Sequence, residues 1–475
     1  MTELSIETTP IPGLLVIHLP VHGDNRGWFK ENWQREKMVA LGLPDFAPIQ
    51  NNMSFNDSRG ATRGVHAEPW DKLVSIASGK IFGAWVDLRE GKTFGKTFTI
   101  EMGPETSVFV PRGVGNSYQT LVDDTVYSYL VNEHWSAQAR DSYTFLNLAD
   151  ETANIPWPIP LGEAELSTAD QEHPRLAEVV PFTEKPALVV GCKGQVGAEL
   201  MKRLPNAHGV DLPEIDLASP DLATALPWSS YGVIYNAAAF TAVDAAETDE
   251  GRQSAWVANV TGVSNLVRLA HRHNLPVVHY STDYVFDGSG DSAWRESDRA
   301  APLSVYGQTK LAGERAVAAC ERHLIFRTSW VYAARGNNFA RTMLRLARER
   351  DQLQVIADQI GAPTGADLLA DVTAHAIRSL GQRPQLAGLY HLAAAGETSW
   401  HGYARHVIDF ARQAGEVIRV APAAIEAVPT SAYPLPAPRP HNSRLDTRKL
   451  QAAFDLCLPD WQAGVDRMLA EILGQ

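Results

Sequence analysis

The sequence predicts two domains, an all-β domain over residues 1–183 and a doubly wound α/β domain over residues 184–475. Short β-like runs that end at glycine, proline or aspartate fill the first part of the chain. From Pro186 onward, apolar strands alternate with glycine turns and long helices, which is typical of a parallel sheet with helical crossovers. Residues 170–186 are polar and interrupted by proline, so we place the boundary near Thr183.

Composition disfavours several functional classes. The chain has 475 residues, of which 45% are hydrophobic and 20% charged, as expected for a soluble protein with more than one core. The formal net charge of −13 disfavours nucleic acid or an anionic membrane as a partner. Three widely spaced cysteines cannot build a disulfide framework, and no segment reads as a signal peptide or a membrane span. We therefore expect a cytoplasmic protein.

The first domain contains five runs of strand-forming residues. They are residues 72–78, 81–88, 96–102, 106–111 and 125–131. Valine, isoleucine, phenylalanine and tyrosine are common in them and turn residues separate them, which is typical of a β-barrel or a β-sandwich.

A histidine and a lysine flank a proline turn in this β domain. His66 and Lys72 occur in the segment RGVHAEPWDK. A base beside an ammonium group suits proton abstraction next to a carbonyl, because the ammonium stabilises the enolate oxygen. Scattered basic residues are also typical of an ordinary solvated surface. Guanidinium groups that could hold a diphosphate are present at Arg26, Arg59, Arg63 and Arg112.

A glycine turn opens the second domain. The apolar run at residues 187–190 leads into GCKGQVG, and a helix follows at once. Glycines let the backbone approach a pyrophosphate, which then lies at the positive N-terminal end of the helix. The expected dinucleotide site includes Gly191, Gly194, Gln195, Val196 and Gly197. Asp211 closes the next strand and either bonds a ribose hydroxyl or belongs to a turn, so NADH and NADPH both stay open.

Two later segments of the second domain carry acid–base groups. Thr282 and Asp283 end a strand, at the edge where open α/β sheets place their ligands. Tyr306 and Lys310 are four residues apart and share a helix face, so the ammonium lowers the pKa of the phenol, which can then deliver a proton at neutral pH. A single match to this spacing is also common on solvated helices.

Motifs across residues 186–475 resemble the extended short-chain dehydrogenases, and within them the dTDP-4-dehydrorhamnose reductase family. They are GCKGQVG, NAAA with TAVD, HYSTDYVFDG, PLSVYGQTKLAGE, FRTSWVY, NNF, DQIGAPT and RPHNS. The resemblance implies a Rossmann-type domain with a smaller substrate-binding lobe and NADPH or NADH as the hydride donor. It further implies that Tyr306 protonates a C4 ketone, Lys310 tunes Tyr306 and binds the nicotinamide ribose, and Thr282 bonds the carbonyl oxygen. Other implied cofactor and sugar contacts are Ala237, Ala238, Asp283 and Trp330, with a core position as the alternative for Trp330.

Motifs across residues 10–183 resemble the dTDP-4-dehydrorhamnose 3,5-epimerase family, a cupin-type jelly roll that usually dimerises. They are DNRGWFKE, QNNMS, RGVHAEPWDK, VDLREGKTFGK, FVPRGVGNSYQ and NLADETANIPWP. The resemblance implies that His66 takes the C5 and C3 protons, Asp150 orients His66, and Lys72 faces the enolate. Tyr129 would return the proton, with Tyr127 as the alternative. The implied substrate contacts are Arg26, Phe29, Glu31, Gln50, Asn52, Arg63 and Asn116.

Two positions depart from the epimerase pattern. Asn116 stands where many members have a histidine, and His134-Trp135 stand where many have a second tyrosine. These departures leave the proton donor, and single or double epimerisation, open. Metal-binding cupins present several histidines at close spacing, whereas His66 has no such neighbours in sequence, so we expect no metal.

The two resemblances together imply a bifunctional enzyme that converts dTDP-4-dehydro-6-deoxy-D-glucose to dTDP-L-rhamnose. One alternative is an active reductase that carries a non-catalytic, dimerising or ligand-binding β domain. Another is that both activities serve a different deoxysugar. We expect a homodimer through the β domain and no nucleic-acid or membrane partner.

Overall fold

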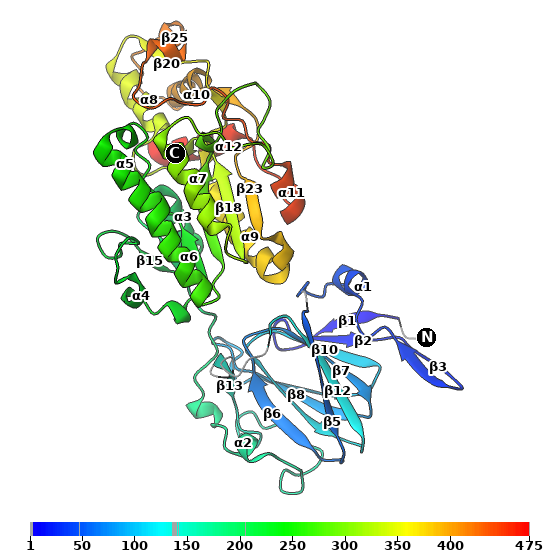
Figure 1. Cartoon of the computed structure of the whole chain (residues 1–475). Helices are drawn as coiled ribbons and strands as arrows, with labels where there is room; N and C mark the ends of the chain where they lie inside the picture. The colour runs from blue at the N-terminus through cyan, green and yellow to red at the C-terminus, as the bar shows by residue number, and fades with distance from the viewer. Residues whose placement is uncertain (1–2, 47, 135–139, 141, 205, 475) are drawn as a thin grey trace. The chain divides into compact units, whose positions relative to one another are not determined.

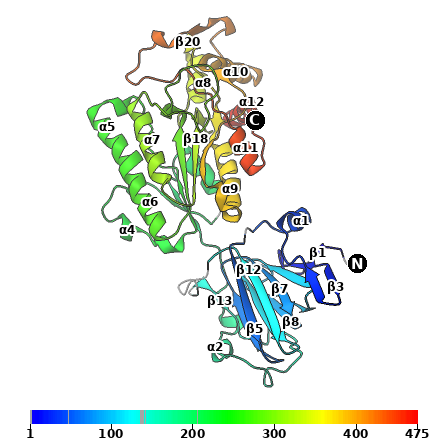
Figure 2. The same cartoon turned by 45° about the vertical axis from the view of Figure 1, so that its right-hand side comes forward.

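The computed structural model describes residues 3–46, 48–134, 140, 142–204 and 206–474. The chain divides into two compact units, Met1–Glu184 and Lys185–Gln475 (Figures 1 and 2). No helix in the described ranges combines the length and the apolar character needed to cross a bilayer. Each unit is described by itself below.

Two antiparallel sheets make up the N-terminal unit. In sheet order, the six-stranded sheet contains β1 (Ser5–Thr8), β2 (Leu15–His18), β10 (Thr106–Val110), β7 (Lys72–Ser78), β12 (Thr125–Val131) and β5 (Gln50–Asn56). The five-stranded sheet contains β13 (Thr144–Phe145), β6 (Thr62–Ala67), β11 (Val114–Thr120), β8 (Ile81–Asp87) and β9 (Thr97–Met102). All five runs predicted from the sequence are strands. The strands that were not predicted include β6 and β11, whose apolar pattern is interrupted by glycine and polar residues.

The N-terminal unit has apolar cores on both faces of β8. Trp85 packs with Val74 and Val108 of the six-stranded sheet, whereas Val86 on the opposite face packs with residues that follow β13, such as Leu148. Each side chain of this kind stabilises the fold by about 1.5–3 kcal/mol when it is fully buried. The segment after β13 is therefore fixed against the five-stranded sheet, and it carries the short helix α2 (Thr168–Gln171), which contacts β6.

A separate hairpin extends from the N-terminal unit. It consists of β3 (Val21–Asp24) and β4 (Gly27–Lys30), which pair only with each other among the described strands, and α1 (Arg35–Ala40) follows it. Figures 1 and 2 show β3 at the opposite end of this unit from β13. Trp28 and Phe29 on the hairpin are 46% and 65% exposed, which is unusual for aromatic side chains in a folded monomer.

A parallel six-stranded sheet organises the C-terminal unit, as the sequence predicts. In sheet order its strands are β15 (His208–Val210), β14 (Ala187–Val190), β16 (Val233–Asn236), β17 (Val277–Thr282), β18 (His323–Thr328) and β23 (Gly388–His391). Helices cover both faces of this sheet (Figure 1). One face bears α3 (Gln195–Arg203), α9 (Ala366–Gln382) and α11 (Arg448–Phe454), and the other bears α4 (Leu222–Ala225), α5 (Asp249–Trp256), α6 (Val263–Arg272) and α7 (Val305–Val317). The chain order reverses between β14 and β16, so this is the switch point where such sheets place ligands.

A smaller lobe has its own apolar core, in which Leu344, Tyr403 and Val465 are buried. Its helices are α8 (Phe339–Glu349), α10 (Trp400–Gln413) and α12 (Trp461–Leu473). Its short strands pair as β20 (Leu353–Ile356) with β25 (Ile425–Val428), β19 (Val331–Tyr332) with β22 (Thr364–Gly365), and β21 (Ile360–Gly361) with β24 (Thr398–Ser399). The lobe follows the carboxyl end of β18, so it lies beside the ligand-binding edge of the sheet.

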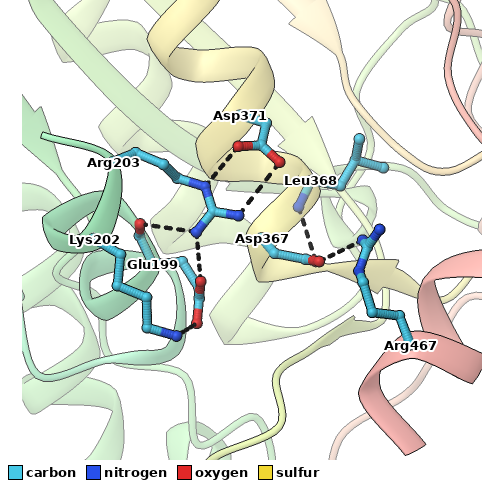
Figure 3. Close-up of polar contacts among 7 residues, drawn as sticks. All are labelled: Glu199, Lys202, Arg203, Asp367, Leu368, Asp371 and Arg467. Atoms are coloured by element: carbon cyan, nitrogen blue, oxygen red, sulfur yellow. Dashed lines mark hydrogen bonds and ion pairs between the residues drawn. The ribbon is translucent and has the colours of Figure 1, made fainter. Parts of the chain in front are cut away.

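Ion pairs connect α3 to α9 (Figure 3). The Arg203 Nε atom lies 2.6 Å from Asp371 Oδ1, and the Arg203 Nη1 atom lies 2.6 Å from Glu199 Oε2. At the start of α9, Asp367 accepts a hydrogen bond from the backbone of Leu368 and forms an ion pair with Arg467 of α12. The helix dipole stabilises a negative charge at this end of the helix. Exposed pairs contribute about 0–1 kcal/mol each, so they help orient α3, while apolar packing supplies most of the stability.

Candidate active sites

The glycine turn between β14 and α3 brings three stretches of backbone together. Gly191 has a φ of +80°, and a Cβ atom there would lie 2.6 Å from the Ala238 nitrogen that follows β16. A Cβ atom on Gly197 would lie 2.0 Å from the Gly191 carbonyl oxygen. Only glycine fits these two positions, because each lies against backbone that cannot move aside.

This turn fits a dinucleotide. Gly194 is the N-cap of α3 without a side chain to occupy the cap, so the first backbone N–H groups of the helix stay available to a phosphate. Gln195 carries a buried side-chain oxygen without a partner, and Val196 follows it in the first turn. The structure thus brings together the predicted Gly191, Gly194, Gln195, Val196, Gly197, Ala237 and Ala238.

Asp211 lies beside this turn. Its Oδ2 atom accepts a hydrogen bond of 2.8 Å from the Lys193 backbone, and its Oδ1 atom accepts one of 2.8 Å from the Leu212 backbone. Both carboxylate oxygens therefore take part in a turn, as one of the two sequence interpretations expected. Each oxygen keeps a second lone pair, so a ribose hydroxyl can also be bound.

The predicted acid–base groups meet at the carboxyl end of β17. Tyr306 and Lys310 lie on α7, and the Tyr306 phenol hydrogen-bonds Thr282 at the end of β17. The Lys310 Nζ atom donates a hydrogen bond of 2.6 Å to the Tyr280 carbonyl oxygen. Thr282 Oγ1 donates a hydrogen bond of 3.0 Å to Asp283 Oδ1. Tyr306, Thr282 and Asp283 are thus connected by hydrogen bonds, and Lys310 bonds the backbone of Tyr280, two residues before Thr282.

Burial sets the protonation of this group. It raises the pKa of Tyr306 above the ordinary phenol value, so the phenol keeps its proton at neutral pH and can donate it. Burial lowers the pKa of Lys310 to about 8, although the nearby Glu314 opposes that shift. Burial also raises the pKa of Asp283 to about 6, against hydrogen bonds from Ser443 and Thr282. Burial, and not Lys310, therefore sets the direction of the Tyr306 pKa shift, contrary to the expected lowering.

Trp330 lies between β18 and the smaller lobe. Its ring stacks on Trp400 with the centroids 3.7 Å apart, and its backbone has a φ of +50°. Such a conformation costs about 1–3 kcal/mol for a residue other than glycine, so the surrounding structure must hold it in place. Trp330 is partly exposed rather than buried in the core.

In the N-terminal unit, His66 lies in a row of cross-strand neighbours. It pairs with Phe145 of β13 on one side and with Asn116 of β11 on the other, so the three side chains share a face of the five-stranded sheet. Tyr127 of the six-stranded sheet donates a hydrogen bond of 3.1 Å to Asn116 Oδ1. His66 therefore faces the space between the two sheets, and its side chain is 34% exposed.

Asp170, and not Asp150, holds the His66 ring. The Asp170 Oδ1 atom lies 2.9 Å from His66 Nε2. Burial by itself would raise the pKa of Asp170, but the hydrogen bond and positive charge of His66 outweigh it and lower the pKa. The predicted partner, Asp150, instead accepts backbone N–H bonds from Thr152, Ala153 and Leu176 at 2.7–2.9 Å. Asp150 thus fastens the segment that carries α2.

A second histidine, which the sequence analysis did not find, lies beside this pair. The His173 Nδ1 atom is 4.0 Å from Asp170 Oδ1, and the His173 ring stacks on Phe145 with the centroids 4.6 Å apart. Burial and the adjacent His66 lower the pKa of His173, so this imidazole is neutral at pH 7. His66 is therefore not isolated from other metal-ligating residues, because the fold brings together side chains more than 100 positions apart.

Lys72 and Tyr129 lie together on the facing sheet. The Lys72 Nζ atom forms an ion pair with Glu68 and lies 4.9 Å from the centroid of the Tyr129 ring. Asn52 hydrogen-bonds Tyr129 and accepts a 2.8 Å bond from Gln50. Burial raises the pKa of Tyr129, and burial beside Tyr118 raises that of Tyr127 further, so both phenols stay protonated. Glu68 is a neighbour of Lys72 that the sequence analysis did not name.

The predicted diphosphate and nucleoside contacts are only partly assembled around His66. Arg63 on β6 donates a 3.1 Å hydrogen bond to Asn56, and Arg112 pairs with Asp71. Arg26, Phe29 and Glu31 lie on or next to the β3–β4 hairpin, and Figures 1 and 2 show β3 away from β13. Within the described part of one chain, Arg26 pairs with Asp24, and Glu31 pairs with Lys37. Arg59 lies in the turn before β6, and Trp135 is outside the described residues.

Comparisons with known proteins match both units separately. The family model described as dTDP-4-dehydrorhamnose 3,5-epimerase matches residues 8–178, and the model described as RmlD substrate binding domain matches residues 185–473. A protein of Streptococcus pyogenes named "Protein RmlC homolog" is 48% identical over 184 residues, which is 38% of this chain and 92% of that protein. A dTDP-4-dehydrorhamnose reductase of Shigella flexneri is 54% identical over 294 residues, which is 60% of this chain and 97% of that protein.

Solved structures agree for the C-terminal unit. A dTDP-4-dehydrorhamnose reductase from Clostridium acetobutylicum matches with a TM-score of 0.56 and 30% identity, over 61% of this chain and all of that one. A reductase from Bacillus anthracis in complex with NADP matches with a TM-score of 0.55 and 30% identity, over the same shares. The chain thus belongs to the dTDP-4-dehydrorhamnose 3,5-epimerase family through its N-terminal unit and to the dTDP-4-dehydrorhamnose reductase family through its C-terminal unit.

Proposed function

We propose that this chain catalyses two consecutive steps that convert dTDP-4-dehydro-6-deoxy-D-glucose to dTDP-L-rhamnose. Residues 1–183 would epimerise C3 and C5, and residues 184–475 would reduce the C4 ketone with NADPH or NADH. The observation that carries this proposal is that one chain contains both sites. In the first unit, the His66–Asp170 pair faces the strand of Tyr127. The second unit has Tyr306 and Lys310 on one helix and a glycine turn that fits a dinucleotide.

The epimerisation uses a base on one side and an acid on the other. His66 takes the proton next to the ketone, and Asp170 stabilises the imidazolium that forms because its carboxylate lies 2.9 Å from the ring. The Lys72 ammonium faces the enolate oxygen and stabilises its charge. A phenol on the opposite sheet returns the proton, so the configuration of the carbon inverts.

We assign that proton donor to Tyr129, with Tyr127 as the alternative. Tyr129 is only partly buried and lies beside Lys72, whereas Tyr127 is 3% exposed and its hydroxyl is engaged by Asn116. A donor must reach the substrate, which favours the more accessible phenol. Asn116 then serves to hold Tyr127 in place, which accounts for an amide at this position.

In the reductase unit, the chain positions the ketone and supplies a proton. Thr282 and Tyr306 offer hydroxyl donors to the carbonyl oxygen, and Tyr306 gives its proton to the alkoxide. Lys310, one helical turn after Tyr306, keeps its positive charge below about pH 8. Asp283 and Trp330 contact the sugar. The glycine turn, Ala237 and Ala238 would hold the pyrophosphate of the dinucleotide, whose nicotinamide would supply the hydride.

Finer structural assignments follow the same reasoning. We infer a cupin-type jelly roll for the first unit from its two antiparallel sheets, and a Rossmann-type domain for the second from its parallel sheet and switch point. We place the enzyme in the cytoplasm, where reduced nicotinamide is available.

We also propose that the N-terminal unit forms a homodimer. The edge strand β5 exposes Met53 and Phe55 at 68% and 56%, and the hairpin exposes Phe29. Exposed apolar side chains on an edge strand favour pairing with another chain. A partner's hairpin would also bring the Arg26, Phe29 and Glu31 contacts toward the site, which one chain alone does not do. The double variant Met53→Lys, Phe55→Lys should be monomeric by light scattering if this surface is the interface.

The proposal is tested by following nicotinamide absorbance with the purified full chain, NADPH and dTDP-4-dehydro-6-deoxy-D-glucose. No separate epimerase is added. We expect steady oxidation that is lost in both His66→Ala and Tyr306→Phe, and that added epimerase restores only in His66→Ala. Oxidation by wild type only after addition of an epimerase would contradict the proposal and support the alternative, a reductase with a non-catalytic β domain.

A further inference from the structure

Three metal-ligating side chains converge at the epimerase site. Donor atoms of His66, Asp170 and His173 all lie within 4.8 Å of one another. His66 Nε2 is 2.9 Å from Asp170 Oδ1, and His173 Nδ1 is 4.0 Å from the same oxygen. The proposed epimerisation uses His66 and Asp170 and leaves His173 without a role.

The orientation of His173 supplies the second observation. Its side chain is 9% exposed, and its Nδ1 atom is buried without a hydrogen-bond partner among the described residues. The ring hydrogen-bonds the Gly64 backbone, and since Nδ1 has no partner, Nε2 is the atom that donates to that carbonyl. The neutral ring therefore points an unused lone pair at a carboxylate. Two facing lone pairs repel each other, and a cation placed between them removes that repulsion.

We propose that His66 Nε2, Asp170 Oδ1 and His173 Nδ1 form a binding site for a divalent transition-metal ion, and that Zn²⁺ in this site blocks the epimerase. Two imidazoles and a carboxylate are a donor set that suits Zn²⁺. Metal–ligand bonds of about 2.0–2.2 Å in a tetrahedron separate the donors by about 3.3 Å. The observed separations from Asp170 Oδ1, 2.9 and 4.0 Å, lie on either side of this value, and all three donors are within 4.8 Å of one another, so side-chain rotations suffice to form the site.

Neighbouring groups support the site, and one opposes it. The hydrogen bond to the Gly64 backbone fixes the His173 tautomer. Metal-binding histidines commonly donate their other ring N–H to an acceptor in this way. The His66 side chain is 34% exposed, so water reaches this ring and would supply the fourth ligand. Arg140 lies 5.8 Å from the Phe145 ring and repels a cation, so we expect moderate affinity rather than a structural metal.

The blocking step follows from the His66 tautomer and rests on the proposed role of His66 as the base. Without metal, Nε2–H donates to Asp170 and Nδ1 keeps the lone pair that removes a substrate proton. When Nε2 binds Zn²⁺ through its lone pair, the proton moves from Nε2 to Nδ1. His66 then has no lone pair facing the substrate, and no net proton or electron is gained or lost.

Binding is tested first, without reference to activity. The chelator-treated full chain is titrated with Co²⁺, whose visible absorption reports nitrogen and oxygen ligands, and then with Zn²⁺ in competition. We expect the signal in wild type and a weakening of about tenfold or more in His173→Gln. His173→Phe is the second variant and replaces His173→Gln if that protein folds poorly, because a phenylalanine ring can still stack on Phe145. We expect the same weakening of metal binding in it. His406→Gln is the matched control, because it removes a histidine 2.6 Å from Asp466 for which the described part of the chain offers no third ligand. Equal binding by wild type and both His173 variants would overturn the site.

Inhibition is then tested on the epimerase step alone. Exchange of substrate protons with deuterium from D2O is followed without nicotinamide, and each variant is compared with its own zinc-free rate. We expect Zn²⁺ to stop exchange in wild type and His406→Gln at concentrations that fill the site, and to leave His173→Gln unaffected there. Metal binding at His173 without any loss of exchange would overturn the blocking step and the base role of His66 together, whereas absence of binding leaves that role untouched.

Discussion

Replacing Asp170 by asparagine tests how the epimerase base is held. The substitution keeps the size of the side chain and an oxygen that can accept the His66 Nε2–H bond, now 2.9 Å long. It removes the negative charge that stabilises His66 when the ring becomes an imidazolium. We expect the epimerase to slow without unfolding.

The size of the effect follows from the burial of the pair. The Asp170 side chain is 9% exposed, so solvent screens its charge only weakly. Hydrogen bonds to charged groups contribute about 1.5–3 kcal/mol. Loss of that amount in the transition state slows the reaction by about 10- to 160-fold, because each 1.36 kcal/mol is a factor of ten.

The assay is deuterium exchange into the sugar in D2O without nicotinamide, which isolates the epimerase step. Asp150→Asn is the matched control, because Asp150 bonds only backbone N–H groups among the described contacts. Its amide would leave the Leu176 N–H without an acceptor, so we expect a loss of about 1–3 kcal/mol of unfolding free energy and near-normal exchange in the folded protein. A large exchange defect in Asp150→Asn with normal exchange in Asp170→Asn would refute this reasoning.

Three further predictions concern the reductase unit, assayed with epimerised sugar. Thr282→Val removes a donor to the carbonyl oxygen, so kcat should fall by about 10²–10³-fold while NADPH binding, measured by fluorescence, stays unchanged; an unchanged kcat would contradict that role. Gly197→Ala places a methyl group against the Gly191 carbonyl. The free energy of unfolding should therefore fall by about 1–3 kcal/mol, and NADPH affinity should fall with it. An unchanged unfolding temperature by calorimetry together with unchanged NADPH binding would disprove the close contact. Because the pKa of Lys310 is lowered to about 8, this lysine loses its charge as pH rises through 8, so kcat/KM should decline above about pH 8, and a profile that stays flat to pH 10 would count against Lys310.

The reductase site could be predicted closely from the sequence because its chemistry is local. The glycine turn directly joins a strand to a helix, and Tyr306 and Lys310 are one helical turn apart. Thr282 ends a strand that a run of apolar residues marks. In a parallel sheet all these strand ends meet at one edge, so the order of the chain places them together. The stacking of Trp330 on Trp400 was not predictable, because the two residues are 70 positions apart in the sequence.

The epimerase site could be predicted only in part. His66 and Lys72 lie near one another in sequence, but Asp170 and His173 reach His66 from a segment about one hundred residues later. The sequence of that segment indicates a polar linker, since a four-residue helix capped by Ser167 leaves no periodic signal. A signal existed in the S-x-x-D spacing of Ser167 and Asp170, where the Ser167 hydroxyl accepts the Asp170 N–H at 3.1 Å. It indicates a helix start, though not its place beside β6.

The central claim is that both units act in series on one sugar. The most direct test runs the complete reaction in D2O with unlabelled NADPH and determines by NMR where deuterium enters the product. The account predicts deuterium at C3 and C5, protium from the nicotinamide at C4, and no labelled product in His66→Ala. Product that is reduced at C4 without deuterium at C3 and C5 would contradict it.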